Sequence, residues 1–333
     1  MKEKVLITGG TGFIGYYIAE QLIQNGYGVV LYDIARTQGE VAWLYSRLPE
    51  QVEFIKGDIG DLASLLNAVK ESGISSVVHA AALTDVEILE KSPLTSLRIN
   101  GIGSINVMEA ARLMDLRRVV MTSSIAVYAP KQYEPIDERH PVLLPDAGPA
   151  LSTYTSSKLT AELFGLHYWQ QYKTSIVAVR FSGVYGFGMR YPLYIKPMLE
   201  NSLAGVPTRI ESGGDAKRDF VYAKDVAQGV FKALTTDEKN LRQRIYNIAH
   251  GGPLKNVFDL ADAVREIVKD ADIYVGGGMT EYEARIDKSR GEYDITKAVE
   301  QLAYSPCYDL KAGIKEYTDL FKSYIKHTGE MKG

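Results

Sequence analysis

Short apolar runs alternate with segments of helical periodicity through the first half of the chain. The runs are those expected of strands buried on both faces, and between them apolar residues recur three and four positions apart, as on one side of a helix. The runs lie at residues 5–7, 29–32, 52–55, 76–80, 118–122 and 175–180, and the helical spacing is clearest at 14–23, 62–69, 99–110 and 154–171. This alternation predicts an α/β fold, a Rossmann-type doubly wound parallel sheet with right-handed crossovers.

The pattern becomes irregular after residue 181, where glycines and prolines punctuate the chain. An apolar run at 244–248 predicts a strand that returns to the sheet, and helical spacing resumes at 256–269. We therefore expect a Rossmann domain over residues 1–180, to which the motifs described below assign nucleotide binding and the catalytic residues. Residues 181–333 are expected to form mainly a smaller substrate-binding subdomain.

The composition narrows the possible partners. A net charge of −3 without a basic block argues against nucleic acid, and no run reaches the ~20 apolar residues that span a membrane. The single cysteine, Cys307, excludes an internal disulfide, and the five histidines show no spacing typical of zinc. We expect no metal site and a reducing, cytoplasmic location.

A glycine cluster joins the first predicted strand to the first predicted helix. Gly9, Gly12 and Gly15 follow the strand at three-residue intervals. The first glycine permits a tight turn, the second lets the backbone approach a pyrophosphate, and the third lets the helix pack closely on the strand. Phosphate oxygens would then meet free N–H groups at the positive end of the helix dipole. The strand–turn–helix context favours a dinucleotide site over an ordinary turn.

An acidic residue ends the second predicted strand. Asp33 lies eighteen residues beyond Gly15, close to the ~20 expected of an acid that binds the ribose hydroxyls. A carboxylate there would repel a 2′-phosphate, which favours NAD over NADP. Arg36 follows three residues later and weakens that preference, because an arginine at this place can accept the phosphate.

A second motif carries the candidate chemistry. Tyr154 and Lys158 are four residues apart on one predicted helix and share a face. A nearby ammonium, together with an oxidised nicotinamide, favours the phenolate, which can exchange a proton with a hydroxyl or carbonyl. Ser123 and Ser124 end a predicted strand at the edge where such sheets place ligands, and we assign Ser124 to orienting the substrate oxygen.

In combination these motifs resemble the extended short-chain dehydrogenase/reductase family, the NAD-dependent epimerase/dehydratase group, and are nearest in pattern to nucleotide-sugar 4-epimerases. The resemblance covers nearly the whole chain. It rests on residues 8–15, 57–59, 79–81, 100–103, 122–124, 127–128, 154–158, 180 with 184–186, 218–225, 246–248 and 294–298.

The resemblance implies an NAD cofactor and a sugar or nucleotide-sugar substrate. The catalytic residues would be Ser124, Tyr154 and Lys158, with Lys158 also holding the nicotinamide ribose. The cofactor would be bound by Gly9, Gly12, Phe13, Ile14, Gly15, Asp33, Asp58, Ile59, Ala80, Ala81, Asn100, Ser123, Tyr154 and Lys158. The substrate would meet Ser124, Gly183, Arg218 and Arg290, with Arg285 as an alternative to Arg290. Family members are commonly homodimers, and the helices near 100–114 and 154–171 would form that interface.

Three features of the sequence, one residue, one segment and one residue pair, depart from the family pattern. Gly183 stands where an asparagine often binds the diphosphate, and the segment 143–152 is longer than usual. Ile125 and Ala126 replace the acidic pair of sugar dehydratases, so a dehydratase is disfavoured. An epimerase of a UDP-hexose is the leading hypothesis. A net dehydrogenase of a free sugar, sugar acid or other secondary alcohol is the alternative, and a non-catalytic nucleotide-binding protein on the same fold is the third.

Overall fold

A seven-stranded parallel sheet forms the centre of the molecule in this computed structural model, which describes residues 2–49, 52–128, 130–142, 153–288 and 290–329. Across the sheet the strands run β10 (Ile245–Ile248), β6 (Ile176–Phe181), β5 (Arg118–Ser124), β4 (Ile74–His79), β1 (Lys4–Thr8), β2 (Gly28–Asp33) and β3 (Glu53–Lys56). The order reverses between β1 and β4, so the chain is doubly wound, as the alternation of runs predicts. The strand expected to return from the second half is β10, which pairs with β6.

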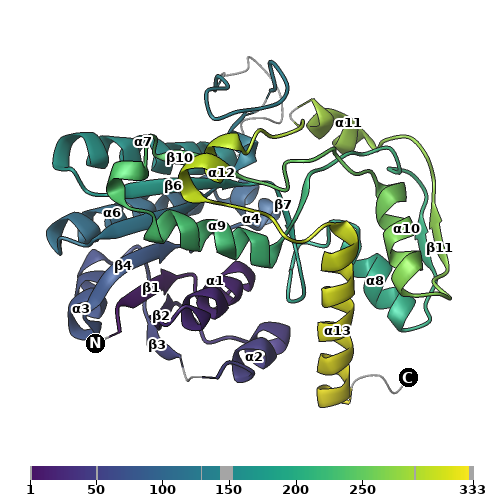
Figure 1. Ribbon diagram of the computed structural model, residues 1–333, viewed down its shortest axis with the longest axis horizontal. Coiled ribbons are helices and arrows are strands. Elements are labelled where there is room, and N and C mark those ends of the chain that lie inside the picture. The colour runs from purple at the N-terminus through teal and green to yellow at the C-terminus, as the bar shows by residue number, and fades with distance from the viewer. Residues whose placement is uncertain (1, 50–51, 129, 143–152, 289, 330–333) are drawn as a thin grey trace.

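Helices cover both faces of this sheet (Figure 1). One layer contains α1 (Phe13–Gln24) and α9 (Ala223–Thr235), and the other contains α3 (Leu62–Ser72), α6 (Gly103–Leu113) and α7 (Thr153–Tyr172). Alternate residues of each strand enter opposite cores: Val5 and Ile7 pack towards α1, whereas Leu6 packs with the α3 layer. The central strands are apolar at successive positions because both of their faces are buried.

The layer around α6 has an irregular beginning. The stretch 99–110, expected as one helix, consists of a π-helical segment, η1 (Leu97–Ile102), followed directly by α6. Two short helices, α4 (Val86–Lys91) and α5 (Pro93–Ser96), precede it. The 3-10 segment η2 (Ile125–Tyr128) follows β5 and leads towards the residues that lie outside the described part of the chain, among them the long segment 143–152.

The second half of the chain adds smaller elements beside the carboxyl ends of the central strands (Figure 1). Two parallel pairs join β7 (Gly183–Tyr185) to β9 (Phe220–Tyr222), and β8 (Thr208–Ile210) to β11 (Ile273–Val275). Around them lie α8 (Ile195–Leu203), α10 (Val257–Ile267), α11 (Glu281–Asp287) and α13 (Leu310–Thr328). The helix α12 (Thr296–Leu302) packs on β10 and α9, and the 3-10 turn η3 (Glu238–Asn240) follows α9.

The two halves are joined across α2 (Gly39–Ser46). Lys196 at the start of α8 forms an ion pair with Glu40, and Trp43 contacts the ring of Tyr324 on α13 edge to face. Residues of both halves therefore belong to one continuous core.

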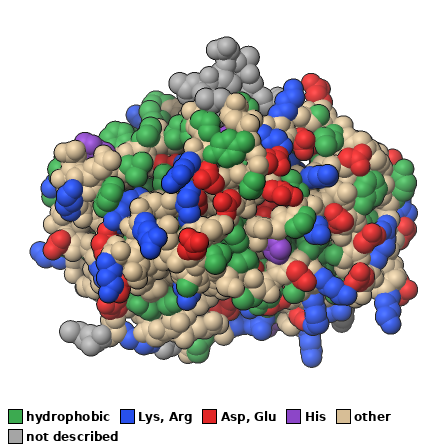
Figure 2. All heavy atoms as spheres, turned by 45° about the horizontal axis from the view of Figure 1, so that its top comes forward, with side chains coloured by type: hydrophobic (Ala, Val, Ile, Leu, Met, Phe, Trp, Pro, Cys, Tyr) green, Lys and Arg blue, Asp and Glu red, His purple; other side chains and the backbone are tan. Residues whose placement is uncertain are grey.

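The surface carries both signs of charge. On the face drawn in Figure 2, lysines and arginines are interspersed with aspartates and glutamates, so that face offers no single-sign patch for a polyanion. None of the helices in the described residues has the length and apolar character that a membrane span requires.

Candidate active site

The glycine turn after β1 has the geometry that a pyrophosphate needs. Gly9 has φ +69°, and a Cβ there would lie 2.5 Å from the backbone N of Ala81, so only glycine fits. A Cβ on Gly15 would lie 2.6 Å from the carbonyl oxygen of Gly9, which explains the close approach of α1 to the turn. Gly12 begins α1 without a side-chain cap, so the first N–H groups of this helix are left for a ligand.

Neighbouring residues complete the floor of this turn. Phe13 and Ile14 form the half-buried first turn of α1, and the Ala80 N–H donates to the carbonyl of Thr8 at 3.0 Å. The Tyr45 hydroxyl on α2 donates to the Gly10 carbonyl at 2.5 Å. No sequence motif pointed to Tyr45, because its contact depends on how α2 folds over the turn.

Asp33 lies beside the glycine turn, where a ribose acid is expected. Its carboxylate accepts hydrogen bonds from Thr11, at 3.2 Å from the backbone N and 2.6 Å from Oγ1, and from the Ile34 N–H at 2.8 Å. Arg36, the residue that complicated the choice of cofactor, places its guanidinium over the Phe54 ring at 4.6 Å from the centroid. The Asp33 carboxylate is thus fixed against the glycine turn, while the Arg36 guanidinium stacks on Phe54 of β3.

The loop after β3 contains Asp58 and Ile59. Asp58 accepts from the Gly60 N–H at 2.8 Å and so shapes its own turn. The Ile59 side chain is buried, and a Cβ on Gly103 would lie 2.6 Å from it. These contacts anchor the loop on α6 at the end of the sheet expected to receive the adenine.

A buried polar network lies beneath the catalytic helix. His79 at the end of β4 bonds Thr8 Oγ1 through Nδ1 at 2.7 Å and Ser104 Oγ through Nε2 at 2.9 Å. Burial, assisted by the charge of Lys158, lowers the pKa of His79 to about 3, so the imidazole is neutral at ordinary pH.

Asn100 is expected to bind the cofactor. In the structure its side chain forms hydrogen bonds within the protein, as part of this network. Its amide accepts from the Leu83 N–H at 2.7 Å, donates to the Leu83 carbonyl at 2.9 Å and reaches Ser157 Oγ at 3.2 Å. The side chain therefore ties the loop after β4 to α7.

The three catalytic candidates converge at the carboxyl end of β5. Lys158 Nζ donates to the Thr122 carbonyl at 2.8 Å and lies 5.7 Å from the centroid of the Tyr154 ring. A hydrogen bond links Tyr154 to Ser124, whose Oγ also accepts from the Ala126 N–H at 3.2 Å. A hydroxyl pair and an ammonium thus share one corner, which can orient an alcohol oxygen and exchange its proton.

The ionisation of this corner differs from the simple expectation. Burial raises the pKa of Tyr154 to about 12, and the Ser124 hydrogen bond only opposes that rise. Burial also lowers the pKa of Lys158 to about 8, against the attraction of Glu162. Desolvation outweighs the ammonium at 5.7 Å, so Lys158 by itself does not produce the phenolate.

Ser123, the other serine of the strand end, has a side chain committed to the interior. Its hydroxyl donates to Glu162 at 2.6 Å, and Glu162 forms a buried two-bond ion pair with Arg180 at 2.8 and 2.6 Å. The Arg180 guanidinium lies over the Tyr128 ring at 4.5 Å. The hydroxyl thus helps to fix β5, β6 and α7 together, and the contact of Ser123 with the cofactor stays a prediction.

Two arginines converge in the second half of the chain. Arg218 is buried, its Nε has no hydrogen-bond partner among the described residues, and it leads into β9 through a bridge to Lys255. Burial and then the positive charge of Arg218 lower the pKa of Arg290 to about 10. Neither guanidinium forms an ion pair within the described part of the chain, so both charges are available to an anion. Arg290 remains the predicted neighbour of Arg218, and the side chain of the alternative, Arg285, lies outside the described part of the structure.

Close packing of β7 against β9 explains why residue 183 is a glycine. Its N–H donates to the Asp219 carbonyl at 3.0 Å, and a Cβ at this position would lie 2.7 Å from that same oxygen. The strands β7 and β9 are too close for any larger residue. The amide that the family often places here is therefore absent together with the space for it.

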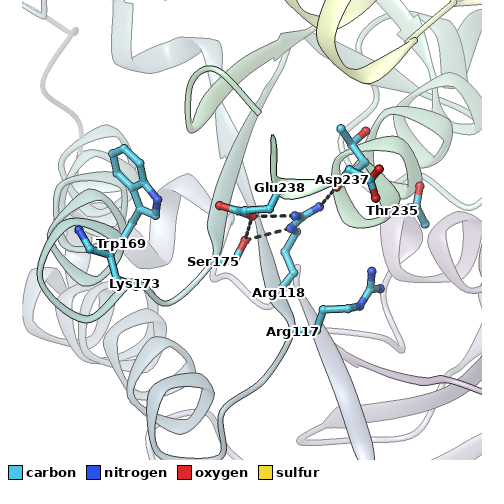
Figure 3. Close-up of a pocket in the computed structure, with 9 residues that line it drawn as sticks. Arg117, Arg118, Trp169, Lys173, Ser175, Thr235, Asp237 and Glu238 are labelled. Atoms are coloured by element: carbon cyan, nitrogen blue, oxygen red, sulfur yellow. Dashed lines mark hydrogen bonds and ion pairs between the residues drawn. The ribbon is translucent and has the colours of Figure 1, made fainter. Parts of the chain in front are cut away.

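A separate hollow of about 480 Å³ lies at the opposite, amino-terminal edge of β5 and β6 (Figure 3). Its central cation, Arg118, is already neutralised: Nη2 pairs with Glu238 at 2.8 Å and Nε donates to Ser175 at 3.0 Å. Arg244 pairs with the same glutamate and lies over the Trp169 ring at 4.5 Å. This hollow is remote from the strand ends that carry the catalytic candidates.

The doubly wound sheet thus carries a glycine turn that suits a pyrophosphate and, at the end of β5, the cluster of Ser124, Tyr154 and Lys158. These features are typical of a dinucleotide-dependent hydride-transfer enzyme. The chain belongs to the NAD dependent epimerase/dehydratase family, whose model matches residues 5–249. It is accordingly an NAD-dependent enzyme of the extended short-chain dehydrogenase/reductase type.

Three relatives illustrate the similarity. A putative UDP-glucose 4-epimerase of Methanocaldococcus jannaschii is 32% identical over 96% of this chain and 98% of its own. A UDP-glucuronate 4-epimerase of Thermodesulfobacterium geofontis is 27% identical over 98% of both. The crystal structure of Thermus thermophilus UDP-glucose 4-epimerase with NAD superposes with a TM-score of 0.74 at 26% identity, covering 96% of this chain and 99% of that one.

Proposed function

We propose that this protein is a UDP-hexose 4-epimerase, acting on a UDP-activated hexose or hexuronate. The observation that carries the proposal is the convergence of Arg218 and Arg290 without ion-pair partners among the described residues. Two guanidiniums that repel each other electrostatically, one of them with a lowered pKa, would be stabilised by a doubly charged ligand such as a diphosphate. The relatives named above, whose printed names are UDP-sugar epimerases, support the same substrate class.

The catalytic corner provides the acid–base part of this reaction. The glycine turn and Asp33 would hold NAD, which would supply a reversible hydride acceptor beside the sugar carbon. The Ser124 hydroxyl orients the reacting oxygen, and Tyr154 takes the hydroxyl proton as the ketone forms and returns it when the alcohol is restored. Lys158, fixed on the Thr122 carbonyl, positions the ribose and keeps a positive charge beside the phenol. Inversion requires the ketone to present its other face, and no net oxidation occurs because the same hydride and proton are returned to the sugar.

The glycine turn and Asp33 fit NAD by their own geometry. The uncapped start of α1 and the closely packed Gly9 and Gly15 leave room for a pyrophosphate and none for side chains. The Asp33 carboxylate is fixed beside that turn, where it can accept from ribose hydroxyls and repel a 2′-phosphate.

The second candidate function is a net NAD-dependent dehydrogenase of an unactivated sugar or sugar acid. Gly183 favours it, because the diphosphate loses one side-chain ligand there. The two functions differ in whether reduced cofactor leaves the enzyme.

The deciding experiment is calorimetric titration of the NAD-loaded protein with UDP. We expect binding that weakens about 10²-fold in Arg218→Ala and in Arg290→Ala, because each variant loses charge-assisted hydrogen bonds of roughly 1.5–3 kcal/mol. Arg209→Ala is the matched control, since Arg209 is exposed and already paired with Asp272. Absence of UDP binding by the wild type would contradict the proposal.

Turnover then separates the two candidates. With UDP-glucose or UDP-glucuronate, an epimerase forms the 4-epimer without accumulating NADH. Accumulation of NADH with a free sugar or sugar acid, and no epimer, would identify the dehydrogenase.

We also propose that the protein is a homodimer joined through η1, α6 and α7. Large apolar side chains are exposed on these packed helices, including Leu163 at 59%, Leu113 at 49% and Ile102 at 46%. An exposed apolar surface of this kind is typical of a protein–protein contact. Sedimentation of the wild type should give a dimer and Leu163→Asp a monomer, and a wild-type monomer would refute the proposal.

A further inference from the structure

The turn that precedes α8 has an unfavourable backbone conformation. Leu193 has φ +46°, and Tyr194, which begins the helix, has φ +64° and ψ −30°. Residues other than glycine rarely adopt positive φ, and two such residues in succession persist only where surrounding contacts enforce this conformation. Such residues concentrate at ligand sites, so the contacts that hold Tyr194 need an explanation.

Tyr194 is held from two sides. Its hydroxyl donates to the carboxylate of Glu283 on α11, and its ring lies 5.9 Å from the guanidinium carbon of Arg218. The same side chain thus contacts one arginine of the candidate diphosphate site and the helix that leads to the other, Arg290. It connects three loops that are distant in the sequence.

Glu283 is itself fixed in place. It is 2% exposed, and its Oε2 accepts from the Thr280 N–H at 3.1 Å and from Thr280 Oγ1 at 3.0 Å in a reciprocal capping box that starts α11. The carboxylate therefore has a rigid position from which to receive the Tyr194 hydroxyl.

The third loop makes room for this pair. Gly213 has φ +111°, and a Cβ there would lie 2.7 Å from Glu283 Oε2 and 3.0 Å from the Tyr194 hydroxyl. The chain passes through Gly213 into Arg218, so this loop is packed against the Tyr194–Glu283 pair just before it delivers the arginine. Only glycine permits that approach.

We infer that the Tyr194–Glu283 hydrogen bond is a positioning pair that sets Arg218 and Arg290 at the separation a diphosphate requires. The inference rests on the proposed nucleotide-sugar function and adds two residues that act through the arginines. Their role is to reduce the movement of the two loops, so that less order has to be gained when the ligand binds.

The test compares UDP with UMP on the NAD-loaded full-length protein by calorimetry. Tyr194→Phe keeps the ring and removes only the hydroxyl. We expect its UDP affinity to fall about tenfold, which corresponds to about 1.4 kcal/mol, and its UMP affinity to fall by less than threefold. NAD content should be unchanged.

A matched variant controls for general loosening of the subdomain. Tyr317→Phe removes another tyrosine–glutamate hydrogen bond, the 2.7 Å contact from α13 to Glu200 on α8, and should leave UDP affinity within twofold of wild type. Glu283→Gln keeps one oxygen to accept from Thr280 and places its amide NH2 opposite the Tyr194 hydroxyl oxygen, to which it can donate, so it should restore affinity relative to Glu283→Ala.

Three results would overturn the inference. They are unchanged UDP affinity in Tyr194→Phe, equal losses for UDP and UMP, and an equal loss in Tyr317→Phe. Failure of the wild type to bind UDP is a different result, since it removes the proposed function and the inference with it.

Discussion

The cofactor side and the substrate side of the site are positioned by different means. On the cofactor side, the backbone positions the residues. Gly9 and Gly15 allow close packing of the turn, and Lys158 donates to the Thr122 carbonyl of a central strand. On the substrate side, Arg218 and Arg290 come from loops, and side chains such as Tyr194 hold those loops together. In the proposed enzyme, regular secondary structure would therefore position the hydride transfer, and loop contacts would position the diphosphate of the substrate.

The cations of the two sides show the same contrast. Burial lowers the pKa of Lys158 to about 8, but the neighbouring Glu162 opposes the shift. Burial lowers the pKa of Arg290 to about 10, and Arg218 adds to the shift instead of opposing it. The lysine is therefore near an acid of the protein, whereas neither arginine forms an ion pair within the described residues.

The largest effect is expected from Tyr154→Phe on the cofactor side. Loss of the phenol should lower kcat about 10²–10⁴-fold, the usual contribution of a positioned acid–base group, while NAD content stays at the wild-type level. Tyr172→Phe, on the exposed end of the same helix, is the control and should keep full activity. Residual kcat within tenfold of wild type would show that the chemistry is not centred on Tyr154.

A second prediction concerns the buried ammonium. Lys158→Met should raise the free energy of unfolding at pH 7 by about 3 kcal/mol, because a pKa lowered from 10.5 to about 8 reflects a cost of charging the folded state. The same variant should lose most turnover.

The pH dependence of stability gives this prediction its sign. Between pH 8 and 10.5 the unfolded chain holds a proton on Lys158 that the folded chain has lost, so this group makes wild-type stability rise with pH in that window. Lys158→Met should lack that contribution in denaturant titrations. A variant less stable than wild type at pH 7 would contradict the assignment.

The smallest effect is expected at the ribose. Asp33→Ala should weaken NAD binding by about 10–100-fold, on the scale of lost hydrogen bonds to a charged group, and should weaken NADP binding much less. Asp309→Ala, which removes the cap of α13 instead, should leave the ratio of the two affinities unchanged. Equal losses of NAD and NADP in Asp33→Ala would refute the role of this carboxylate.

Sequence reasoning worked best where local spacing determines structure. The strand–glycine–helix order, and the four-residue separation of Tyr154 and Lys158, are properties of the chain itself, and the structure brings Ser124 to that pair. The doubly wound sheet follows from the same alternation of runs.

It worked less well where a side chain chooses between partners. Asn100 and Ser123 stand where the family pattern expects cofactor ligands, yet their polar atoms are taken up by Leu83 and Glu162. Tyr194 lacked any motif, because its contacts with Arg218 and Glu283 join residues that are 24 and 89 positions away. Long-range choices of this kind become visible only once the loops are folded.

Gly183 also has a consequence for redesign. A Cβ at this position would lie 2.7 Å from the Asp219 carbonyl, so reinstating the asparagine would require β9 to move. The Asp219 carboxylate receives the Ser182 hydroxyl at 2.5 Å and the N–H groups of His250 and Gly251 at 3.0 and 3.1 Å, which anchors that strand to the loop after β10. A Gly183→Asn substitution alone is therefore expected to clash with β9. A library that aims to recover an amide at position 183 must also vary positions 182, 219 and 250–251.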